Sequence, residues 1–465
     1  MSPQSPDGSF RGRAVSPSEY KMKQEVLIIG GGFSGLSAGV ELASRGYHVT
    51  VIERKGHLGG RAYSYKDPVS GSVIDNGQHI LMGCYHDTLS FLEKIGTRDK
   101  VKFQRNLVVD FAGIGVDPVR FQSLPLPNPF HLLTGFLFFR GLSLRDKWSA
   151  LKLGSVFRNS SLDLKALDQK SIPQWLGELG QTRQIQDRFW NILTLAALND
   201  RPELSSAALL AAVLKEALFS GKRNARIGIP TVGLSDLYTE AARDYIEQRG
   251  GHFLMKSRVA RVHFKGDEVQ EVELEGARRV SSDIFLITVP FTALRKILPD
   301  DVLYGSSYFA NLSHLQVSPI VAINLWFDRP VIHRPFVGFW GTRVHWLFNK
   351  GYAFKEGPSY LSLVISGARE ELGMAASELT EIALQELRLI YPHVGQAKLL
   401  RSMVTKEPEA TMAPAVQASR FRPSQKSPYH NLFLAGDWTD TGLPATIESA
   451  VRSAKKAVEL IDAEV

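Results

Sequence analysis

The chain has 465 residues, of which 44% are hydrophobic, and it carries a formal net charge of +8 with a single cysteine. This length allows a large core divided between two domains, and one cysteine excludes an internal disulfide. The basic excess suits an anionic lipid surface or nucleic acid, but zinc-finger spacings, RNP-type strands and long Lys/Arg runs are missing, so we expect no nucleic-acid partner.

Residues 1–23 are rich in Ser, Pro and Gly and contain no apolar run, which predicts a disordered leader rather than a signal peptide. No segment approaches the roughly 20 apolar residues of a membrane-spanning helix, so we expect a cytoplasmic protein. The most apolar stretch, residues 129–139, is followed by four basic residues set among apolar ones: Arg140, Arg145, Lys147 and Lys152. This mixture is typical either of a helix on an anionic membrane surface, at the inner face of the cell membrane, or of a core helix with a solvated face.

The clearest signal lies near the N-terminus, in EVLIIGGGFSGLSAGVELASRGYHVTVIERK. Its apolar pattern predicts a strand, a helix and a second strand, over residues 26–29, 36–45 and 48–52. Gly30-x-Gly32-x-x-Gly35 lies between the first strand and the helix, and Glu53 follows the second strand, about 20 residues further on. This arrangement is the fingerprint of a dinucleotide-binding βαβ unit and predicts a Rossmann-like α/β fold.

Each glycine of this fingerprint has a physical role. Gly30 allows a tight turn, Gly32 allows a pyrophosphate to approach the backbone, and Gly35 allows the helix to pack closely on the strand. Glu53 is expected to accept hydrogen bonds from ribose hydroxyls. The fingerprint alone does not distinguish NAD from FAD.

The residues after Glu53 narrow the choice of cofactor. ERKGHLGGRAYSY places Gly59, Gly60 and Arg61 where an NAD dehydrogenase usually continues into another helix. The glycine pair admits a second close approach of the backbone to a cofactor, and Arg61 can lie beside phosphate or flavin. This extended motif resembles flavoproteins of the amine oxidase and phytoene desaturase superfamily. The resemblance implies a discontinuous FAD-binding Rossmann-like domain with an inserted, mixed α+β substrate domain.

The C-terminal segment NLFLAGDWTDTGLPATIESA resembles the part of that superfamily which completes the flavin site. It predicts a strand over residues 432–435, a glycine turn, and a helix that starts near residues 444–446. The resemblance implies that Asp437 binds the ribityl chain of FAD and that the helix N-terminus stabilises negative charge on the reduced flavin. The alternative is that Asp437 only caps the helix.

The resemblance implies non-covalent FAD, because relatives that attach FAD covalently use a C-terminal cysteine and Cys84 is distant from that position in sequence. A segment in the middle of the chain resembles the one that contacts adenine through its backbone, at Val259. We expect no metal site. The expected cofactor-binding residues are Gly30, Gly32, Phe33, Ser34, Gly35, Glu53, Arg54, Gly59, Gly60, Arg61, Val259, Gly436, Asp437, Ala445, Thr446 and Ile447.

Four further stretches resemble the hydroxysqualene dehydroxylases: VIDNGQHILMGCYHDTLSFLEKIG, FWNILTLAALNDRPELSSA, SPIVAINLWFDRPV and FVGFWGTRVHWLFNK. This resemblance extends from residue 24 to the C-terminus. It implies a reaction of squalene and hopanoid biosynthesis, in which a C30 isoprenoid alcohol, hydroxysqualene, and reduced FAD give squalene, water and oxidised FAD. An electron donor, which the sequence does not identify, must then reduce the flavin.

Such a reaction needs a proton donor, and the loop after Arg61 offers Asp75, Gln78 and His79 as candidate catalytic residues. His79 suits this role best by its intrinsic pKa, although the loop can equally serve only to shape the FAD pocket. Apolar residues in three predicted elements are typical either of a tunnel for a C30 chain or of ordinary core: Trp190, Leu193, Leu195 and Leu198; Ile323, Leu325 and Phe327; Trp346 and Phe348.

We predict an FAD domain formed by residues 24–85, 225–300 and 405–465, and a substrate domain formed by residues 86–224 and 301–404. Periodicity further predicts a helix over residues 234–248, strands over 320–327, 344–348 and 360–365, and a helix over 376–390. The nearest alternative function is a carotenoid desaturase or isomerase of the same fold. A flavin amine oxidase and a non-catalytic, FAD-bound scaffold also stay open.

Overall fold

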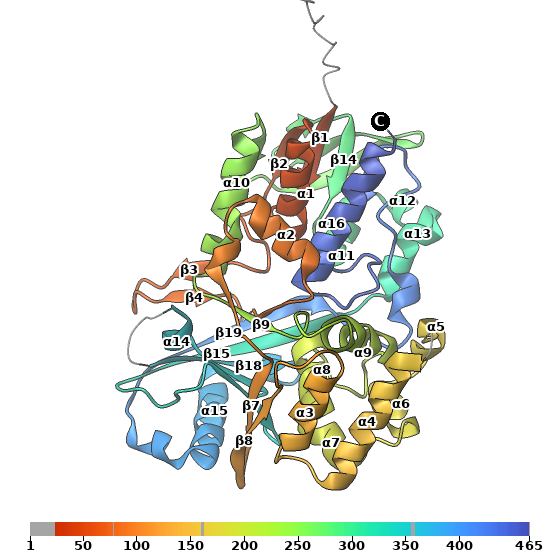
Figure 1. The fold of residues 1–465 in the computed structure, drawn as a ribbon. Coiled ribbons are helices and arrows are strands. Elements are labelled where there is room, and N and C mark those ends of the chain that lie inside the picture. Colours follow the sequence, from red (N-terminus) through yellow and green to blue (C-terminus); the bar gives the residue numbers. More distant parts are fainter. Residues whose placement is uncertain (1–23, 78, 160–161, 355–358, 465) are drawn as a thin grey trace, which may run out of the picture.

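The computed structural model describes residues 24–77, 79–159, 162–354 and 359–464. Two large sheets divide these residues into two halves (Figure 1). The first sheet is parallel, with the strand order β10-β2-β1-β14-β20. Its strands are β1 (Glu25–Ile29), β2 (His48–Ile52), β10 (His252–Leu254), β14 (Ile284–Ile287) and β20 (Leu432–Leu434). Segments from both ends and from the middle of the chain therefore build one sheet.

Both faces of this parallel sheet are covered by other elements, and its strands are mainly apolar. Val26 and Ile28 pack beneath helices on one face, whereas Leu27 and Ile29 pack against the opposite layer. The helices of the first face are α1 (Phe33–Ser44), α10 (Glu240–Glu247) and α16 (Ile447–Asp462). The opposite layer contains β11 (Val259–Lys265), β12 (Glu268–Leu274) and α11 (Phe291–Ile297). A parallel sheet covered on both faces is the arrangement expected of a Rossmann-like fold, so the predicted α/β class is confirmed.

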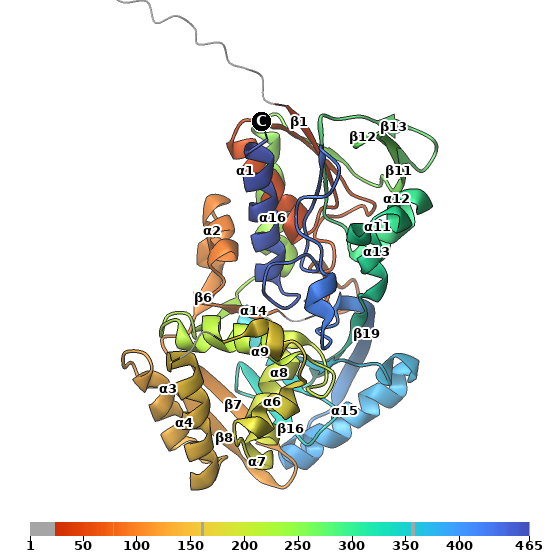
Figure 2. The same cartoon turned by 90° about the vertical axis from the view of Figure 1, so that its right-hand side faces the viewer.

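The second sheet has seven strands of mixed direction, in the order β19-β15-β18-β17-β16-β7-β8. Its strands are β7 (Val108–Gly113), β8 (Val116–Gln122), β15 (Val317–Phe327), β16 (Phe336–Trp340), β17 (Trp346–Asn349), β18 (Tyr360–Ser366) and β19 (Leu399–Met412). Helix α15 (Ala376–Ile390) covers one face, and a group of helices covers the other (Figure 2). That group includes α3 (Phe130–Phe138), α4 (Leu144–Asn159), α6 (Ile172–Glu178), α8 (Asn191–Leu198) and α9 (Ala207–Leu214).

The structure differs from the sequence predictions mainly where elements begin and end. Helix α1 begins at Phe33, three residues before the predicted start, because the glycine turn leads directly into the helix. The helix predicted over residues 234–248 is a π-helical turn, Ser235–Thr239, followed by α10. The predicted domain boundary at residue 405 falls inside β19, which stays paired with β15 as far as Met412. We therefore place the crossing between the two halves after that strand.

Candidate active site

A cavity of about 600 Å³ joins the two halves of the molecule. At one end it is lined by residues that follow the carboxyl ends of the parallel strands: Gly30 after β1, Glu53 after β2, Ser257 after β10, Thr288 after β14 and Gly436 after β20. Ligands of open α/β sheets bind at this edge. The other end lies among apolar side chains of the mixed sheet and its covering helices.

The glycine turn after β1 shows which glycines the fold needs. A Cβ atom on Gly35 would lie 1.9 Å from the carbonyl oxygen of Gly30, so α1 packs on the turn at a distance that only glycine permits. Gly30 has a φ of +116°, which other residues rarely adopt. A Cβ on Gly32 would instead meet nothing closer than 3.8 Å, because Gly32 faces the cavity.

The N-terminus of α1 is open toward this cavity. Its N-cap is Gly32, which has no side chain to cap the helix, and the first turn contains no acidic residue. Amides of a first turn lack partners within the helix and carry partial positive charge, so they bind anions. The residues present thus fit the pyrophosphate of a dinucleotide, and Phe33 and Ser34 line the cavity at the same place.

Glu53 lies at the cavity wall, and its carboxylate already accepts two backbone hydrogen bonds. The amide of Gly31 donates to Oε2 at 2.9 Å, and the amide of Lys55 donates to Oε1 at 2.8 Å. A carboxylate has about four lone-pair sites, so Glu53 keeps capacity for the ribose hydroxyls assigned to it. Arg54, Gly59, Gly60 and Val259 also line this part of the cavity.

The two ends of the chain meet at Arg61 and Asp437. Arg61 Nη2 lies 2.5 Å from Asp437 Oδ1, and Arg61 Nη1 donates to the carbonyl oxygen of Ala410 at 3.1 Å. Nearby, the amide of Gly436 donates to Ser453 Oγ at 2.8 Å. The glycine motif and the C-terminal turn, remote in sequence, therefore line one cavity, although their predicted contacts with FAD stay predictions.

Arg422 organises the C-terminal turn, and the sequence analysis missed it. This residue is 6% exposed, and its guanidinium donates to the carbonyl oxygens of Leu443, Asp437 and Thr439. Burial lowers the pKa of Arg422 to about 10, so the group stays cationic at neutral pH. Backbone carbonyls distributed over a loop leave no pattern in the sequence, and that is why no signal pointed to Arg422.

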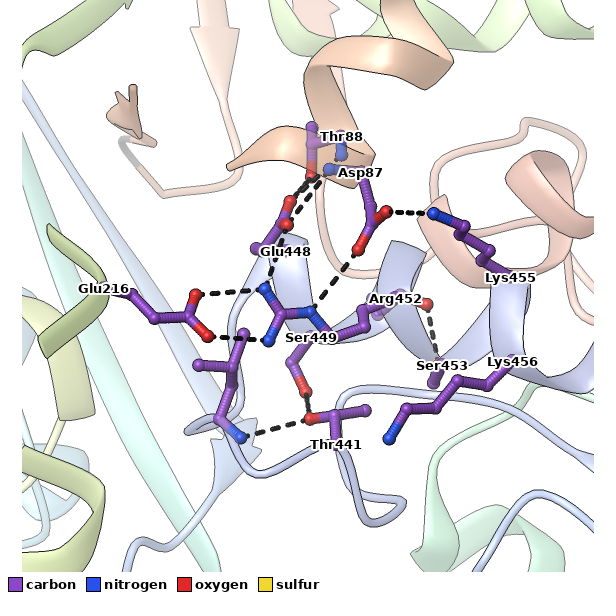
Figure 3. A network of polar contacts seen from close by, with 12 residues as sticks. Asp87, Thr88, Glu216, Thr441, Glu448, Ser449, Arg452, Ser453, Lys455 and Lys456 are labelled. Atoms are coloured by element: carbon purple, nitrogen blue, oxygen red, sulfur yellow. Dashed lines mark hydrogen bonds and ion pairs between the residues drawn. The ribbon is translucent and has the colours of Figure 1, made fainter. Parts of the chain in front are cut away.

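A polar network fixes the N-terminus of α16 beside the cavity (Figure 3). Thr446 caps the helix by accepting from the amide of Ser449 at 3.2 Å, and Thr446, Ile447 and Ala450 line the cavity together with Ala445. One turn along the helix, Arg452 forms a bidentate pair with Glu216 of the mixed-sheet half, at 2.9 and 3.0 Å. The start of α16 is thus held against both halves of the molecule. Its stabilisation of negative charge on the reduced flavin stays a prediction.

Glu448 of α16 caps a different helix, α2 (His86–Lys94). Its carboxylate accepts from the amides of Asp87 and Thr88, at 3.1 and 3.0 Å, and from the Thr88 hydroxyl at 2.8 Å (Figure 3). Burial raises the pKa of Glu448 above its ordinary value. Because α2 has no capping side chain of its own, this contact couples the loop that carries His79 and Cys84 to α16.

The structure places two of the three predicted catalytic residues, His79 and Asp75, in different surroundings. His79 lines the cavity, and burial lowers its pKa to about 4, so its imidazole is neutral at pH 7. Asp75 does not line the cavity; its carboxylate accepts from the amide of Leu234 and pairs with Lys350 Nζ at 2.5 Å. Gln78 lies outside the described residues.

Lys350 is a buried cation that the sequence analysis missed. The side chains of Lys350 and Asp75 are 2% and 4% exposed, and both charges act on His79. Lys350 is paired with Asp75 and is not among the residues that line the cavity.

Some of the residues predicted to form a tunnel line the apolar end of the cavity, and others do not. Leu193, Leu195, Trp346 and Phe348 line it, whereas Trp190 and Leu198 are buried in the core. Ile323, Leu325 and Phe327 point to the other face of β15, beneath α15, and Ile320 lines the cavity instead. A strand buried on both faces does not reveal from periodicity which face meets the cavity.

Cys84 lines the same cavity, so its distance in sequence from the C-terminal segment does not keep it from the cofactor. Burial, together with the charges of Glu216 and Glu448, raises the pKa of its thiol to about 12. The thiolate is the nucleophilic form of cysteine, and at neutral pH this thiol is protonated. Non-covalent binding of FAD stays a proposal. Its basis is that a protonated thiol is a poor nucleophile, rather than the position of Cys84 in the sequence.

The described residues contain no group of three or more His, Cys, Asp or Glu side chains arranged to hold a metal ion. Across the same residues, every helix is too short or too polar to cross a bilayer.

A Rossmann-like sheet with an open helix N-terminus, joined to a second sheet over an apolar cavity, is typical of dinucleotide-dependent oxidoreductases. The sequence profile of the flavin-containing amine oxidoreductases matches residues 33–462, so the chain belongs to this family. FAD is therefore its cofactor, which confirms the prediction from the glycine motifs.

Relatives of known activity resemble the chain along nearly its whole length. Hydroxysqualene dehydroxylase from Zymomonas mobilis subsp. mobilis is 28% identical over 439 residues, covering 93% of this chain and 98% of the relative. Hydroxysqualene dehydroxylase from Rhodopseudomonas palustris is 30% identical over 450 residues, covering 95% and 99%. A 15-cis-phytoene desaturase from Solanum lycopersicum is 25% identical over 476 residues, covering 94% and 77%.

Among solved structures, an oxidoreductase from Methanosarcina mazei is similar, with a TM-score of 0.75 and 18% identity over 94% of this chain and 100% of that one. At this identity the similarity shows the fold alone.

Exchanging Gly32 for alanine is expected to weaken FAD binding without unfolding the protein. The new methyl group meets no atom within 3.8 Å in the folded chain, but it occupies the space in which pyrophosphate would approach the backbone. We expect the Kd for FAD, measured by fluorescence titration of the apoprotein, to rise at least ~10-fold, which corresponds to about 1.4 kcal/mol.

Two further glycines serve as controls. Gly177→Ala adds a methyl group that has no neighbour within 4 Å and should leave FAD affinity unchanged, whereas Gly35→Ala should unfold the turn. Equal FAD affinity in Gly32→Ala and Gly177→Ala would contradict the assignment of Gly32.

Proposed function

We propose that the chain reduces hydroxysqualene to squalene with reduced FAD. The observation that carries this proposal is the continuity of one cavity, whose first end has the glycine motifs of the FAD site and whose second end is apolar. The similarity in sequence to two hydroxysqualene dehydroxylases along more than nine-tenths of the chain supports the choice of substrate.

The reaction balances as one alcohol and one reduced flavin giving one hydrocarbon, one water molecule and one oxidised flavin. The allylic C–O bond breaks after its oxygen accepts a proton, and the resulting cation is delocalised over the adjacent double bond. When bound, reduced FAD would supply the hydride for the new C–H bond. The protein must present a proton to the hydroxyl oxygen and keep bulk water away from the cation.

Polar and aromatic residues that line the cavity suit the positioning of the hydroxyl group and the exclusion of water. His79 lines the cavity with a neutral imidazole, whose single ring N–H is a hydrogen-bond donor, and we propose that it orients the hydroxyl group. The nearby Tyr85 also lines the cavity, and burial raises the pKa of its phenol above the ordinary value, so its O–H is intact. Beyond them, Phe121, Phe136 and Phe189 exclude water from the hydrocarbon chain.

Anaerobic mixing separates this proposal from its nearest alternative. Photoreduced enzyme mixed with hydroxysqualene is expected to regain the spectrum of oxidised flavin, with one squalene extracted for each flavin reoxidised. Under illumination a sacrificial donor such as EDTA supplies the electrons that reduce the flavin, so the physiological donor is not needed. A phytoene desaturase would behave in the opposite way: phytoene would bleach the oxidised enzyme, and hydroxysqualene would leave the reduced enzyme unchanged.

A further inference from the structure

Exposed apolar side chains are concentrated in one short part of the chain. Nine of the eighteen large apolar residues that are exposed among the described residues fall within residues 124–151. Six of them lie on α3 and at the start of α4, and we call these the α3–α4 face: Phe130, Leu133, Leu137, Phe138, Leu144 and Trp148. Soluble proteins usually expose such residues singly, whereas a cluster marks an interaction surface.

The members of this face are neighbours in space as well as in sequence. Helices α3 and α4 pack side by side, at the end of the molecule remote from the parallel sheet (Figures 1 and 2). Lys147 Nζ donates to the carbonyl oxygen of Leu137 at 2.8 Å and so ties the start of α4 to the end of α3. Phe138 and Trp148, the residues that follow these two, are 63% and 69% exposed.

The charges around the α3–α4 face have one sign. Arg140, Arg145 and Lys152 are exposed, and Lys147 is half-buried. The acidic residue among them, Asp146, is 1% exposed and accepts hydrogen bonds from Ser143 and Thr182. Exposed apolar side chains surrounded by arginine and lysine are the combination that binds an anionic lipid surface.

Helix α3 also forms a wall of the active-site cavity. Leu132 and Phe136, on its inner side, line the cavity, whereas Leu133 and Leu137 are exposed on its outer side. A single helix therefore separates the apolar end of the cavity from the α3–α4 face. An apolar surface on both sides of one helix is unnecessary for a helix that only covers a core.

We propose that the α3–α4 face docks the protein on an anionic lipid bilayer. A second copy of the chain fits this face less well, because a twofold contact would set its arginines and lysines against the same residues of the partner. The docking itself does not depend on the identity of the substrate. If the proposed function holds, docking places the apolar end of the cavity next to the phase in which a C30 hydrocarbon dissolves.

Cosedimentation of the FAD-loaded protein with lipid vesicles tests this proposal. We expect the protein to pellet with vesicles of phosphatidylcholine and phosphatidylglycerol, and to be released progressively as salt is raised. The variant Leu137→Ser/Phe138→Ser/Trp148→Ser removes three exposed apolar side chains and should lower partitioning by about 100-fold. The matched control Tyr304→Ser/Leu389→Ser/Leu400→Ser removes equally exposed side chains from other elements and should bind as the wild type does.

Three outcomes would overturn the proposal: no binding of the wild type to anionic vesicles, an equal loss of binding in the control, or unchanged binding in the face variant. Sedimentation velocity without lipid tests whether the α3–α4 face instead binds a second copy of the chain. A wild-type dimer that the face variant converts to a monomer would assign the face to self-association. None of these experiments contains substrate. A negative result for vesicle binding therefore does not bear on the proposed reaction, and a negative result for the reaction does not bear on vesicle binding.

Discussion

Replacement of Arg422 by methionine is expected to empty the FAD site and to lower the free energy of unfolding by at least about 3 kcal/mol. The guanidinium binds the carbonyl oxygens of Leu443, Asp437 and Thr439, which belong to the turn between β20 and α16. Methionine fills a similar volume but leaves these buried carbonyls without donors, each at a cost of about 1–3 kcal/mol. The flavin content of the purified protein and its denaturant midpoint are the measurements.

The neighbouring Arg420 provides the matched control. Arg420 is exposed and lies over the ring of Phe421, so Arg420→Met should change stability by less than about 0.5 kcal/mol. Arg422→Lys keeps the charge but loses the planar fork of donors, and it should fall between the methionine variant and the wild type. An Arg422→Met protein that is yellow and as stable as the wild type would show that the turn does not depend on this side chain.

Replacement of Lys350 by methionine is expected to cost about 3–5 kcal/mol, because it leaves the Asp75 carboxylate buried without its cation. The two side chains are 2% and 4% exposed, and Lys350 Nζ lies 2.5 Å from Asp75 Oδ2. Chemical denaturation of the variant and of the wild type measures this loss of stability.

The double variant Asp75→Asn/Lys350→Met completes this test. It removes both charges, and buried pairs replaced as a whole usually cost much less than one partner alone, so it should recover a large part of the stability. NMR titration of His79 gives an independent readout. The charge of Lys350 contributes to the low pKa of His79, so Lys350→Met should raise that pKa above about 4. Equal losses of stability in the single and double variants would show that the unpaired Asp75 carboxylate is not the cause of the loss.

Much of the parallel-sheet half follows from the sequence alone. The residues of β1 and β2 are apolar runs of strand length, and the glycines between them have roles that depend only on local backbone geometry. The same holds for α15, whose predicted bounds, 376–390, are those observed. Local periodicity and glycine chemistry act over a few residues, so they are visible without the fold.

The sequence alone did not reveal residues whose roles depend on partners far away along the chain. Arg422 and Lys350 look like ordinary surface cations in the sequence, and only the tertiary structure buries them against the turn at Asp437 and against Asp75. The sequence also did not reveal that Ile320 lines the cavity and Ile323 does not, because both faces of β15 are covered by other elements. Cys84 is distant in sequence from the C-terminal segment, and only the packing of the chain places both at the same cavity.

The sequence by itself therefore determined the family and the cofactor and predicted the two chain segments that bind it, because glycine turns and apolar periods encode local backbone geometry. The tertiary structure decided which charges are buried, which face of each strand meets the cavity and where apolar side chains gather on the surface. These properties arise from contacts between residues hundreds of positions apart, and a buried charge or an exposed apolar cluster is defined only by its neighbours in space.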